Sequence, residues 1–489
     1  MTSDSLRPRL PAGLSSATPL PILNPTVISV GVFAACVGVG ALMAYDPATG
    51  IGVLMALCYA PVVLLNLPLG IVLWVPTTFL TALPGVDTAS HAAGFLIAFA
   101  WLGTLRNRSE EQHAPIPRRM LVVLALFTVW LTVSMAWSED AGLSFAAWQP
   151  WVACALMFTV LLTIDLDESQ IRMLAFSFLV GVTFSVALGL IGGVEAPSAE
   201  SAIADDGRLR GGLDDPNYLA AGIVPSIAIA AGLLPGVRSV LGRIGLAVAS
   251  VILVLGLAAT QSRGGLIAAV VATAAALVVA KRGRAAVVAG IAIVVGLVAV
   301  WFAASPDAWD RVTSTADNGN GRGSLWKVGG RVFSDHPVIG VGLDNYRVYA
   351  PRYVSGPGQL TFVNFIAERP HVVHNVYLQM LVESGLVALA LFLVIVLGSL
   401  ASALRAAQFF EQRQDPVMAA LSRGVFVALL AGLAASFFIS NGQSFQIWVL
   451  LSFGPILLRY TRRGTDTPPP AEEPIPALTR PLPLPAVRV

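Results

Sequence analysis

Two histidines stand three residues apart in RPHVVHNVYLQMLVESG, residues 369–385, where a long apolar run begins. They are His371 and His374, and the whole chain has only 5 histidines. Glu383 follows about two helical turns into the apolar run. An imidazole exchanges protons near neutral pH, so this stretch predicts acid–base chemistry at a membrane boundary. A simple helix cap is the alternative for His374, and a plain loop residue is the alternative for His371.

A second group of reactive residues is made of arginines. Arg208 and Arg210 lie in RLRGGLDDPNYLAA, and Arg263 lies in the tight turn of TQSRGGLIA between two apolar runs. A guanidinium group suits phosphate because its planar donor fork matches the oxygens and stays charged. Ion pairs with nearby aspartates, or contact with lipid phosphates, are the plainer alternatives. With a histidine base, these cations could hold a diphosphate leaving group while a hydroxyl is activated.

The elements that must position these residues are membrane spans. The chain has 489 residues, of which 56% are hydrophobic and 12% charged, and its mean hydropathy is +0.76. Soluble domains carry about 25% charged residues. Apolar runs of about 20 residues recur along the chain, so we predict an all-α polytopic membrane protein with about 12–14 transmembrane helices. The predicted spans are 26–44, 50–66, 69–83, 91–104, 120–137, 149–164, 171–193, 217–234, 242–259, 264–280, 285–304, 375–402, 421–440 and 445–459. The three cysteines, Cys36, Cys58 and Cys154, lie inside apolar runs and indicate neither a disulfide framework nor a metal site.

Lysine and arginine alternate between connections, which predicts the orientation of the chain. The expected order is a cytoplasmic leader (1–25), transmembrane helices with arginine-bearing outer loops (26–304), a long extracytoplasmic loop (305–374), further transmembrane helices (375–460) and a Pro-rich cytoplasmic tail (461–489). Both termini are then cytoplasmic and the histidines and arginines share the outer face. Within the long loop, a helix-like piece around 324–334 is expected to lie along the membrane surface on Trp326, Val328, Val332 and Phe333.

Four segments resemble the O-antigen ligase and polymerase superfamily. They are RLRGGLDDPNYLAA (208–221), TQSRGGLIA (260–268), GRGSLWKVGGRVFSDHPVIGVGLDNY (321–346) and HNVYLQMLVESGL (374–386). Each is similar to a family pattern: an arginine before Pro-Asn, a Ser-Arg-Gly turn, an outer loop with Trp and His-Pro, and His-Asn followed by Leu-Gln. Their order and their shared face make the resemblance specific over roughly 205–390.

The resemblance implies a multi-span glycosyltransferase of the GT-C type in the cytoplasmic membrane. Such enzymes move a glycan from undecaprenyl diphosphate to an acceptor hydroxyl on the outer face, without metal, nucleotide or other cofactor. The partners expected are the lipid-linked donor, a glycan or lipid acceptor and membrane lipids, with no nucleic acid. Ligase and polymerase share these segments, so the resemblance leaves the choice between them open, together with the sugar and the acceptor.

The resemblance also assigns roles to residues. His374 would deprotonate or orient the acceptor hydroxyl. Arg263, with Arg208 or Arg210, would bind the diphosphate, and the family pattern does not choose between the last two. Further substrate contacts or supporting residues are His371, Arg322, Trp326 and Glu383, each with plain packing as its alternative.

Three other interpretations remain at this stage. A GT-C enzyme could use a carboxylate base, for which Glu139, Asp140 and Asp87 are the candidates on outer loops. The two histidines could bind a metal if they shared a helix face and found a third ligand. A transporter would need a polar pathway through the membrane, which the nearly charge-free apolar runs do not favour.

Overall fold

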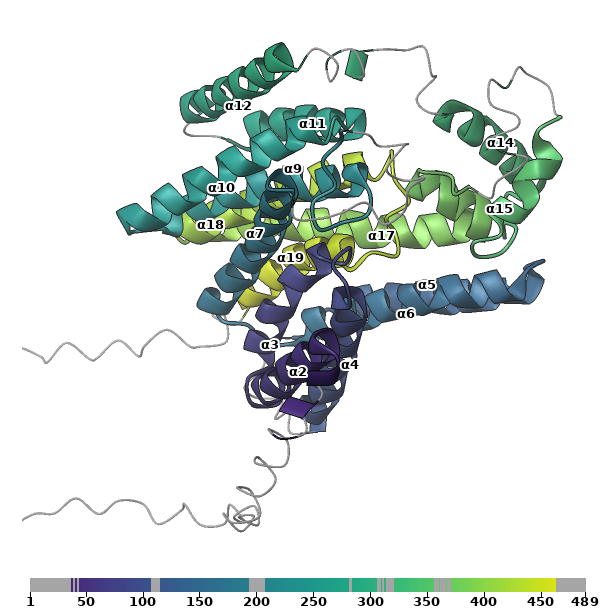
Figure 1. Cartoon of the computed structure of the whole chain (residues 1–489), viewed down its shortest axis with the longest axis horizontal. Coiled ribbons are helices and arrows are strands. Elements are labelled where there is room, and N and C mark those ends of the chain that lie inside the picture. Colours follow the sequence, from purple (N-terminus) through teal and green to yellow (C-terminus); the bar gives the residue numbers. More distant parts are fainter. Residues whose placement is uncertain are drawn as a thin grey trace, which may run out of the picture. The chain divides into compact units, whose positions relative to one another are not determined.

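The structure is a computed structural model, all-helical in the ranges it describes (Figure 1). These ranges are 44–106, 115–192, 207–280, 284–305, 321–355 and 371–462, with a few isolated positions between them. The predicted leader, nearly all of the first predicted span and the Pro-rich tail from residue 463 lie outside them. Contacts divide the chain into residues 1–58 and 59–489, and everything below concerns the second unit.

Eight helices in the described ranges are long and apolar enough to cross a membrane. They are α4 (Val86–Arg106), α5 (Arg118–Ser134, extended by the 3-10 turn η3, Met135–Trp137), α6 (Ala141–Thr163), α7 (Glu168–Leu190), α9 (Pro216–Leu233, extended by η4, Leu234–Gly236), α10 (Val240–Ala259), α17 (Val376–Gln412) and α18 (Pro416–Ala435). Shorter apolar helices are α2 (Pro47–Leu65), α3 (Leu67–Trp74) with η1 (Val75–Phe79), α11 (Arg263–Val279) and α12 (Arg284–Ala304). The remaining helices are α14 (Arg322–Asp335), α15 (Tyr346–Tyr349), η5 (Ala350–Tyr353) and α19 (Phe445–Arg462). The predicted class, an all-α polytopic membrane protein, is confirmed.

Connections that the charge pattern assigned to one face meet at one end of the bundle. At the basic end, Arg459 pairs with Asp165 at 2.6 Å and Arg172 donates to the carbonyl oxygen of Gly236 at 2.7 Å. At the opposite end, the Val376 N–H donates to the Ser436 carbonyl at 3.1 Å. The alternation of the loops therefore agrees with the fold, while the side of the membrane that each end faces stays a prediction.

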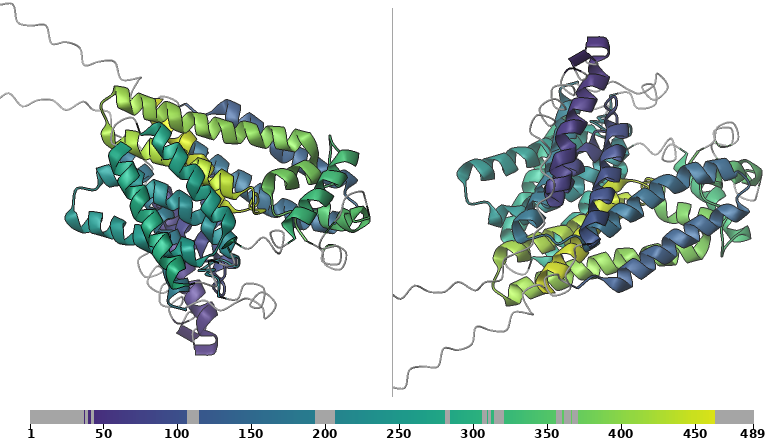
Figure 2. Two further views of the ribbon diagram at one scale, coloured as in Figure 1. Left: turned by 90° about the horizontal axis from the view of Figure 1, so that it is seen from above. Right: turned by 90° about the horizontal axis from the view of Figure 1, so that it is seen from below.

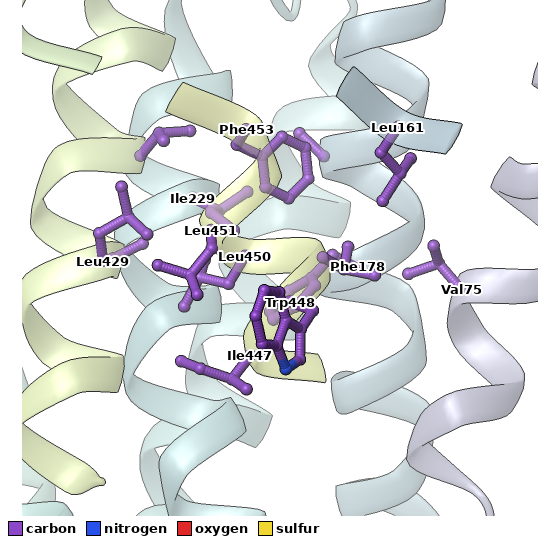
Figure 3. Close-up of a cluster of buried hydrophobic side chains, with 14 of the residues drawn as sticks. Val75, Leu161, Phe178, Ile229, Leu429, Ile447, Trp448, Leu450, Leu451 and Phe453 are labelled. Carbon is purple, nitrogen blue, oxygen red and sulfur yellow. The ribbon is translucent and has the colours of Figure 1, made fainter. Parts of the chain in front are cut away.

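The core is apolar and centres on α19, where Trp448 is fully buried (Figure 3). The Phe158 ring meets Trp448 edge-on at 5.3 Å between centroids, the arrangement that aromatic quadrupoles favour. Beside this cluster α9 crosses α18 at Gly232 and Gly424, where an added Cβ on Gly424 would lie 2.7 Å from the Ala228 carbonyl oxygen. Small residues at such a crossing let the two backbones approach, as is common between membrane helices.

Helix α14 corrects one expectation. Its apolar side chains Leu325, Val328 and Val332 are buried inside the protein, at 0–1% exposure. They pack toward α17. A Cβ added at Gly329 would lie 3.3 Å from the Leu378 side chain of α17. The expectation that Val328 and Val332 face the membrane surface is wrong, because α17 covers them, while Trp326 and Phe333 of the same expectation are partly buried.

Helix α17 is broken at Gly385, whose φ is 74° and ψ is −175°. The backbone groups released there bond to residues of the preceding loop: Val341 N–H donates to the Val382 carbonyl at 3.0 Å and Gly342 N–H to that of Glu383 at 2.8 Å. Glycine adopts this left-handed φ without a Cβ penalty. An added Cβ would also overlap the carbonyl oxygen of Val338.

Replacing Gly385 by alanine is therefore expected to destabilise the fold by about 2–4 kcal/mol, from backbone strain and overlap together. The matched control is Gly245→Ala in α10, where an added Cβ meets nothing within 4 Å. That variant should change stability by less than about 1 kcal/mol, in the stabilising direction. Apparent melting temperatures in detergent compare the two, and equal values would contradict the account of the break.

Candidate functional site

Four helices begin close together at the end of the bundle opposite the basic end. Asp215 caps α9, Ser262 caps α11 and Asn375 caps α17, each accepting hydrogen bonds from N–H groups of the first turn. Helix α14 starts there too, after Gly321 with φ 77°. Helix N-termini carry partial positive charge and attract anions, so this end of the bundle is electropositive before any side-chain charge is counted.

Side-chain contacts tie these helix starts to one another. Ser262 Oγ donates to Asn217 Oδ1 at 2.9 Å, which joins α11 to α9. Trp326 of α14 donates from Nε1 to the Val373 carbonyl oxygen at 3.1 Å, just before α17. The Trp326 ring also lies 6.2 Å from that of Phe438, and Phe438 packs on Gly264 of α11. The four helix starts thus share one neighbourhood, which we call the site end.

Arg208 belongs to this neighbourhood through its own side chain. Its Nε donates to the Thr260 carbonyl oxygen at 3.0 Å, and its Nη2 donates to Asn217 Oδ1 at 3.1 Å. The Leu209 N–H adds a bond to the Ala259 carbonyl at 3.0 Å. The loop that carries Arg208 is therefore fastened to the turn that precedes Arg263. Arg210 lies two residues further along the same loop and is partly buried.

Arg263 is the first residue of α11 and is partly buried. The turn before it is tight because Gln261 adopts a left-handed backbone, with φ 50°. Gly264 follows, and a Cβ added there would lie only 2.9 Å from the Phe438 side chain. The start of α11 therefore lies against the turn between α18 and α19. The local sequence Gln-Ser-Arg-Gly thus holds the Arg263 guanidinium at the positive end of a helix.

His374 sits directly before the cap of α17 in a left-handed conformation, with φ 53°. This backbone costs a residue other than glycine about 1 kcal/mol and is often found where function requires it. Burial lowers the pKa of His374 from 6.5 to about 4, and the positive charge of Arg322 and the proximity of His371 act in the same direction. Asp215 opposes the shift. His374 is therefore neutral at pH 7, with a ring nitrogen able to accept a proton.

The remaining predicted site residues are Arg322, His371, Trp326 and Glu383, and they do not all lie beside His374. Arg322 and His371 belong with His374, on whose charge state both act. His371 and His374 lie outside any helix, so the idea that they share a helix face is wrong. Trp326 donates to the Val373 carbonyl oxygen and packs against Phe437 and Phe438.

Glu383 lies elsewhere in the protein. It is 2% exposed and receives hydrogen bonds from Gln379 Nε2 at 3.2 and 3.3 Å. Its surroundings are Asp344 and Arg347 of the loop that enters the α17 break. Glu383 thus finds the polar neighbours that a buried carboxylate needs, some two turns of α17 away from His374.

Two residues of the site end carried no chemical assignment from the sequence. Asn217 accepts from both Arg208 and Ser262 with the same oxygen, and Asp215 faces His374. The pattern Asp-Pro-Asn indicates a helix start, and Asp215 does cap α9. The contact of Asn217 with Ser262 and the effect of Asp215 on His374 join residues far apart in the sequence. A short motif gives no signal for such interactions.

A small cavity lies behind the site end, beneath Tyr218. Its volume is about 30 Å³, and Tyr218, Asn441, Ser444 and Gln446 supply its polar lining. Such a space holds about one or two water molecules. A sugar or a polyprenyl chain is far larger than this cavity.

The carboxylates considered as alternative bases have other partners. Glu139 forms a two-pronged ion pair with Arg352, and Asp140 caps α6 by accepting from the Leu143 N–H at 3.0 Å. Asp87 lies 3.6 Å from His91. The charged or titratable groups that act on His374 are instead Arg322, Asp215 and His371.

Residues 248–393 match the family described as O-antigen ligase. The matched stretch contains Arg263, Arg322 and His374, and it ends inside α17, while Arg208 and Asn217 precede it. No curated protein matches the chain.

Proposed function

We propose that the chain, whose residues 248–393 match the family described as O-antigen ligase, transfers a glycan from a polyprenyl diphosphate to an acceptor hydroxyl. Undecaprenyl diphosphate is the expected carrier, and the expected place is the outer face of the cytoplasmic membrane. The family assigns the protein to polysaccharide assembly by a ligase-type or glycosyltransferase-type enzyme. Donor, acceptor and reaction chemistry are our proposal.

One observation carries the proposal: a neutral histidine stands at a helix-start cluster that also holds Arg208, Arg263 and Arg322. A diphosphate needs several fixed positive groups, and an attacking hydroxyl needs a base that is unprotonated at neutral pH. Both requirements are met within one neighbourhood at a helix end. Arg208 is favoured over Arg210 as the second diphosphate ligand because its side chain is joined to the Arg263 turn.

The proposed reaction is a single displacement. The acceptor oxygen gives its proton to His374 and forms a bond to the anomeric carbon, while the bond from that carbon to the diphosphate oxygen breaks. The lipid diphosphate leaves as an anion, and the guanidinium groups and helix N-termini stabilise its growing charge. A single displacement inverts the configuration at the anomeric carbon.

The competing interpretations have less support. A carboxylate base would have to be Glu139, Asp140 or Asp87, and each is engaged away from the arginines. A transporter needs polar groups along its pathway, whereas the described centre of the bundle is the aromatic and aliphatic cluster around Trp448 (Figure 3).

The direct test is transfer by the purified protein in detergent, with an undecaprenyl-diphosphate oligosaccharide from the host as donor. We expect release of undecaprenyl diphosphate in the presence of EDTA, and the product tells a ligase from a polymerase. Loss of activity in EDTA that added Mg²⁺ restores would contradict the metal-independent mechanism. A wild-type protein that binds the donor but never cleaves it would contradict the transferase proposal itself.

A separate prediction concerns Asn217. Asn217→Ala removes the oxygen that receives Arg208 and Ser262, and we expect the KM for the donor to rise about tenfold, the equivalent of one hydrogen bond to a charged group. Asn217→Asp keeps the acceptor but adds a negative charge, so it should retain the melting temperature and still weaken donor binding. Asp214→Asn, an exposed neighbouring change, is the control. An unchanged donor KM in Asn217→Ala would show that this residue does not position the arginines.

A further inference from the structure

The turn between α18 and α19 is in contact with the helix starts of the site end. It consists of residues 436–444, and we call it the floor turn. The Val376 N–H of α17 donates to the Ser436 carbonyl oxygen at 3.1 Å. Phe438 lies against the start of α11, and its ring is 6.2 Å from that of Trp326 in α14. Three of the four helix starts therefore rest on the first part of the floor turn.

The fourth helix start, that of α9, is joined to the floor turn by Tyr218. The Tyr218 hydroxyl donates to the Ser440 carbonyl oxygen at 2.8 Å. The turn is also anchored in the core, because Nε1 of Trp448 donates to the Gly442 carbonyl oxygen at 2.8 Å. It leads into α19, which runs alongside α17 (Figure 2). The position of the floor turn thus affects how all four helix starts stand relative to one another.

The small cavity described above lies between the floor turn and α9. Its volume of about 30 Å³ suits about one or two water molecules. The rest of the lining is apolar and comes from η1, α7, α9, α18 and α19. The polar side chains of the lining are Tyr218, Asn441, Ser444 and Gln446.

Asn441 is the unusual member of this lining. It is only 6% exposed, yet within the described ranges of the chain its Oδ1 receives no hydrogen bond. The hydroxyl oxygen of the preceding residue, Ser440, is buried in the same condition. A buried polar group left unpaired costs about 1–3 kcal/mol, so native folds pair such groups with protein or with ordered water.

The other polar side chains of the cavity can also bond to water. The Tyr218 and Ser444 hydroxyls use their hydrogens on carbonyl oxygens of the floor turn, so their own oxygens can still accept. Gln446 donates from Nε2 to the Thr78 carbonyl oxygen, and its Oε1 is a further acceptor. A water molecule beside Asn441 therefore has the two to four polar partners that a buried water needs.

We propose that this cavity is a binding site for ordered water, held by Asn441, which joins the floor turn to α9. The residues that line the cavity carry no charged side chain, so the lining offers a cation no counter-charge. The space is also too small for an acyl chain. Water thus forms part of the support on which the four helix starts stand, and this inference does not depend on the proposed reaction.

The experiment is radiolytic footprinting of the full-length protein in detergent. A short X-ray pulse converts water to hydroxyl radicals, and radicals formed from a bound water oxidise the side chains beside it, even where bulk solvent has no access. Mass spectrometry gives the oxidation rate at each residue. Phe79 and Phe178 line the cavity and are each 1% exposed. The reference residues are Phe158 and Phe392, equally buried at 0% and 1% but in the apolar core.

We expect Phe79 and Phe178 of the wild-type protein to be oxidised severalfold faster than the reference residues. Asn441→Leu keeps the number and branching of the heavy atoms but removes the amide, so it should lower both rates to the reference level. Gln443→Leu is the matched control, since Gln443 belongs to the floor turn but does not line the cavity. It should keep the wild-type rates.

Equal rates at the cavity and at the reference residues of the wild-type protein would show a dry cavity and overturn the proposal. This comparison needs no variant, so it holds even if Asn441→Leu fails to fold. Fast oxidation that persists in Asn441→Leu would overturn the assignment of Asn441 as the residue that holds the water. Asn441→Met, which also lacks the amide, is the second variant, and melting temperatures establish that each variant is folded.

Discussion

His374→Ala is expected to lower kcat for glycan transfer by about 10²–10⁴-fold, the contribution of a positioned general base. His374→Asn should lower kcat by the same factor. Asparagine tolerates the left-handed backbone found at this position, so a loss of activity in this variant reflects the missing base and not a changed backbone. Donor binding should persist in both variants, since the arginines remain. The assay is steady-state transfer, with donor binding measured in parallel.

A matched control exists in the same loop. His336→Ala removes a histidine whose ring meets Tyr349 at 5.6 Å, outside the site end, and activity should stay within about twofold of wild type. If His374→Ala and His374→Asn both keep activity within tenfold of wild type, His374 is only part of the helix start. Asp215 would then be the next candidate for the base.

The pH dependence follows from the lowered pKa. Only neutral His374 accepts a proton, and its pKa of about 4 means that kcat/KM should stay level through neutral pH and fall as the pH drops through about 4. The negative diphosphate favours the protonated ring, so kcat should begin to fall at a higher pH than kcat/KM. A kcat/KM that declines at pH 6.5 would contradict the buried environment of His374.

The same shift affects stability. In the unfolded chain His374 takes up its proton near pH 6.5, and in the folded protein only near pH 4. Between these values the unfolded state binds more protons, so His374 makes the free energy of unfolding decrease as the pH falls from 6.5 to 4. His374→Asn should lose this part of the pH dependence.

Arg263→Ala is the second change with a large expected effect, a loss of about 10²–10³ in kcat/KM for the donor. Arg263 stands at the first position of α11, so in the proposed complex the helix dipole and the guanidinium would act on the same diphosphate. Arg263→Lys keeps the charge but loses the planar fork, so it should recover part of the activity and remain about tenfold below wild type.

Arg352→Ala is the matched control for Arg263. Arg352 is more than half exposed and pairs with Glu139, so its loss should leave donor kinetics within about twofold of wild type. Isothermal binding of the lipid donor separates affinity from rate in each variant. Donor affinity and kcat unchanged in Arg263→Ala would rule out a diphosphate contact by this residue, whatever the role of His374.

The site was only partly accessible from sequence. His374, Arg263 and Arg208 could be singled out because charged or titratable side chains at the ends of apolar runs are unusual and costly. The choice between Arg208 and Arg210 could not be made, since both occupy the same loop. We propose Arg208 because the side-chain oxygen of Asn217 accepts from both Arg208 and Ser262, which joins this loop to the turn before Arg263.

What the sequence by itself determined is local in origin: the membrane class, most of the spans, and the helices that begin near residues 217 and 375. Hydropathy and capping act within windows of a few to about 20 residues, so they can be read along the chain. Tertiary structure alone decided that α14 packs on α17, that α17 breaks at Gly385, and that the partly buried His374 is under the influence of Asp215 and Arg322. These features depend on contacts such as that of Trp130 with Ser384, 254 residues apart, which exist only once all the helices have packed.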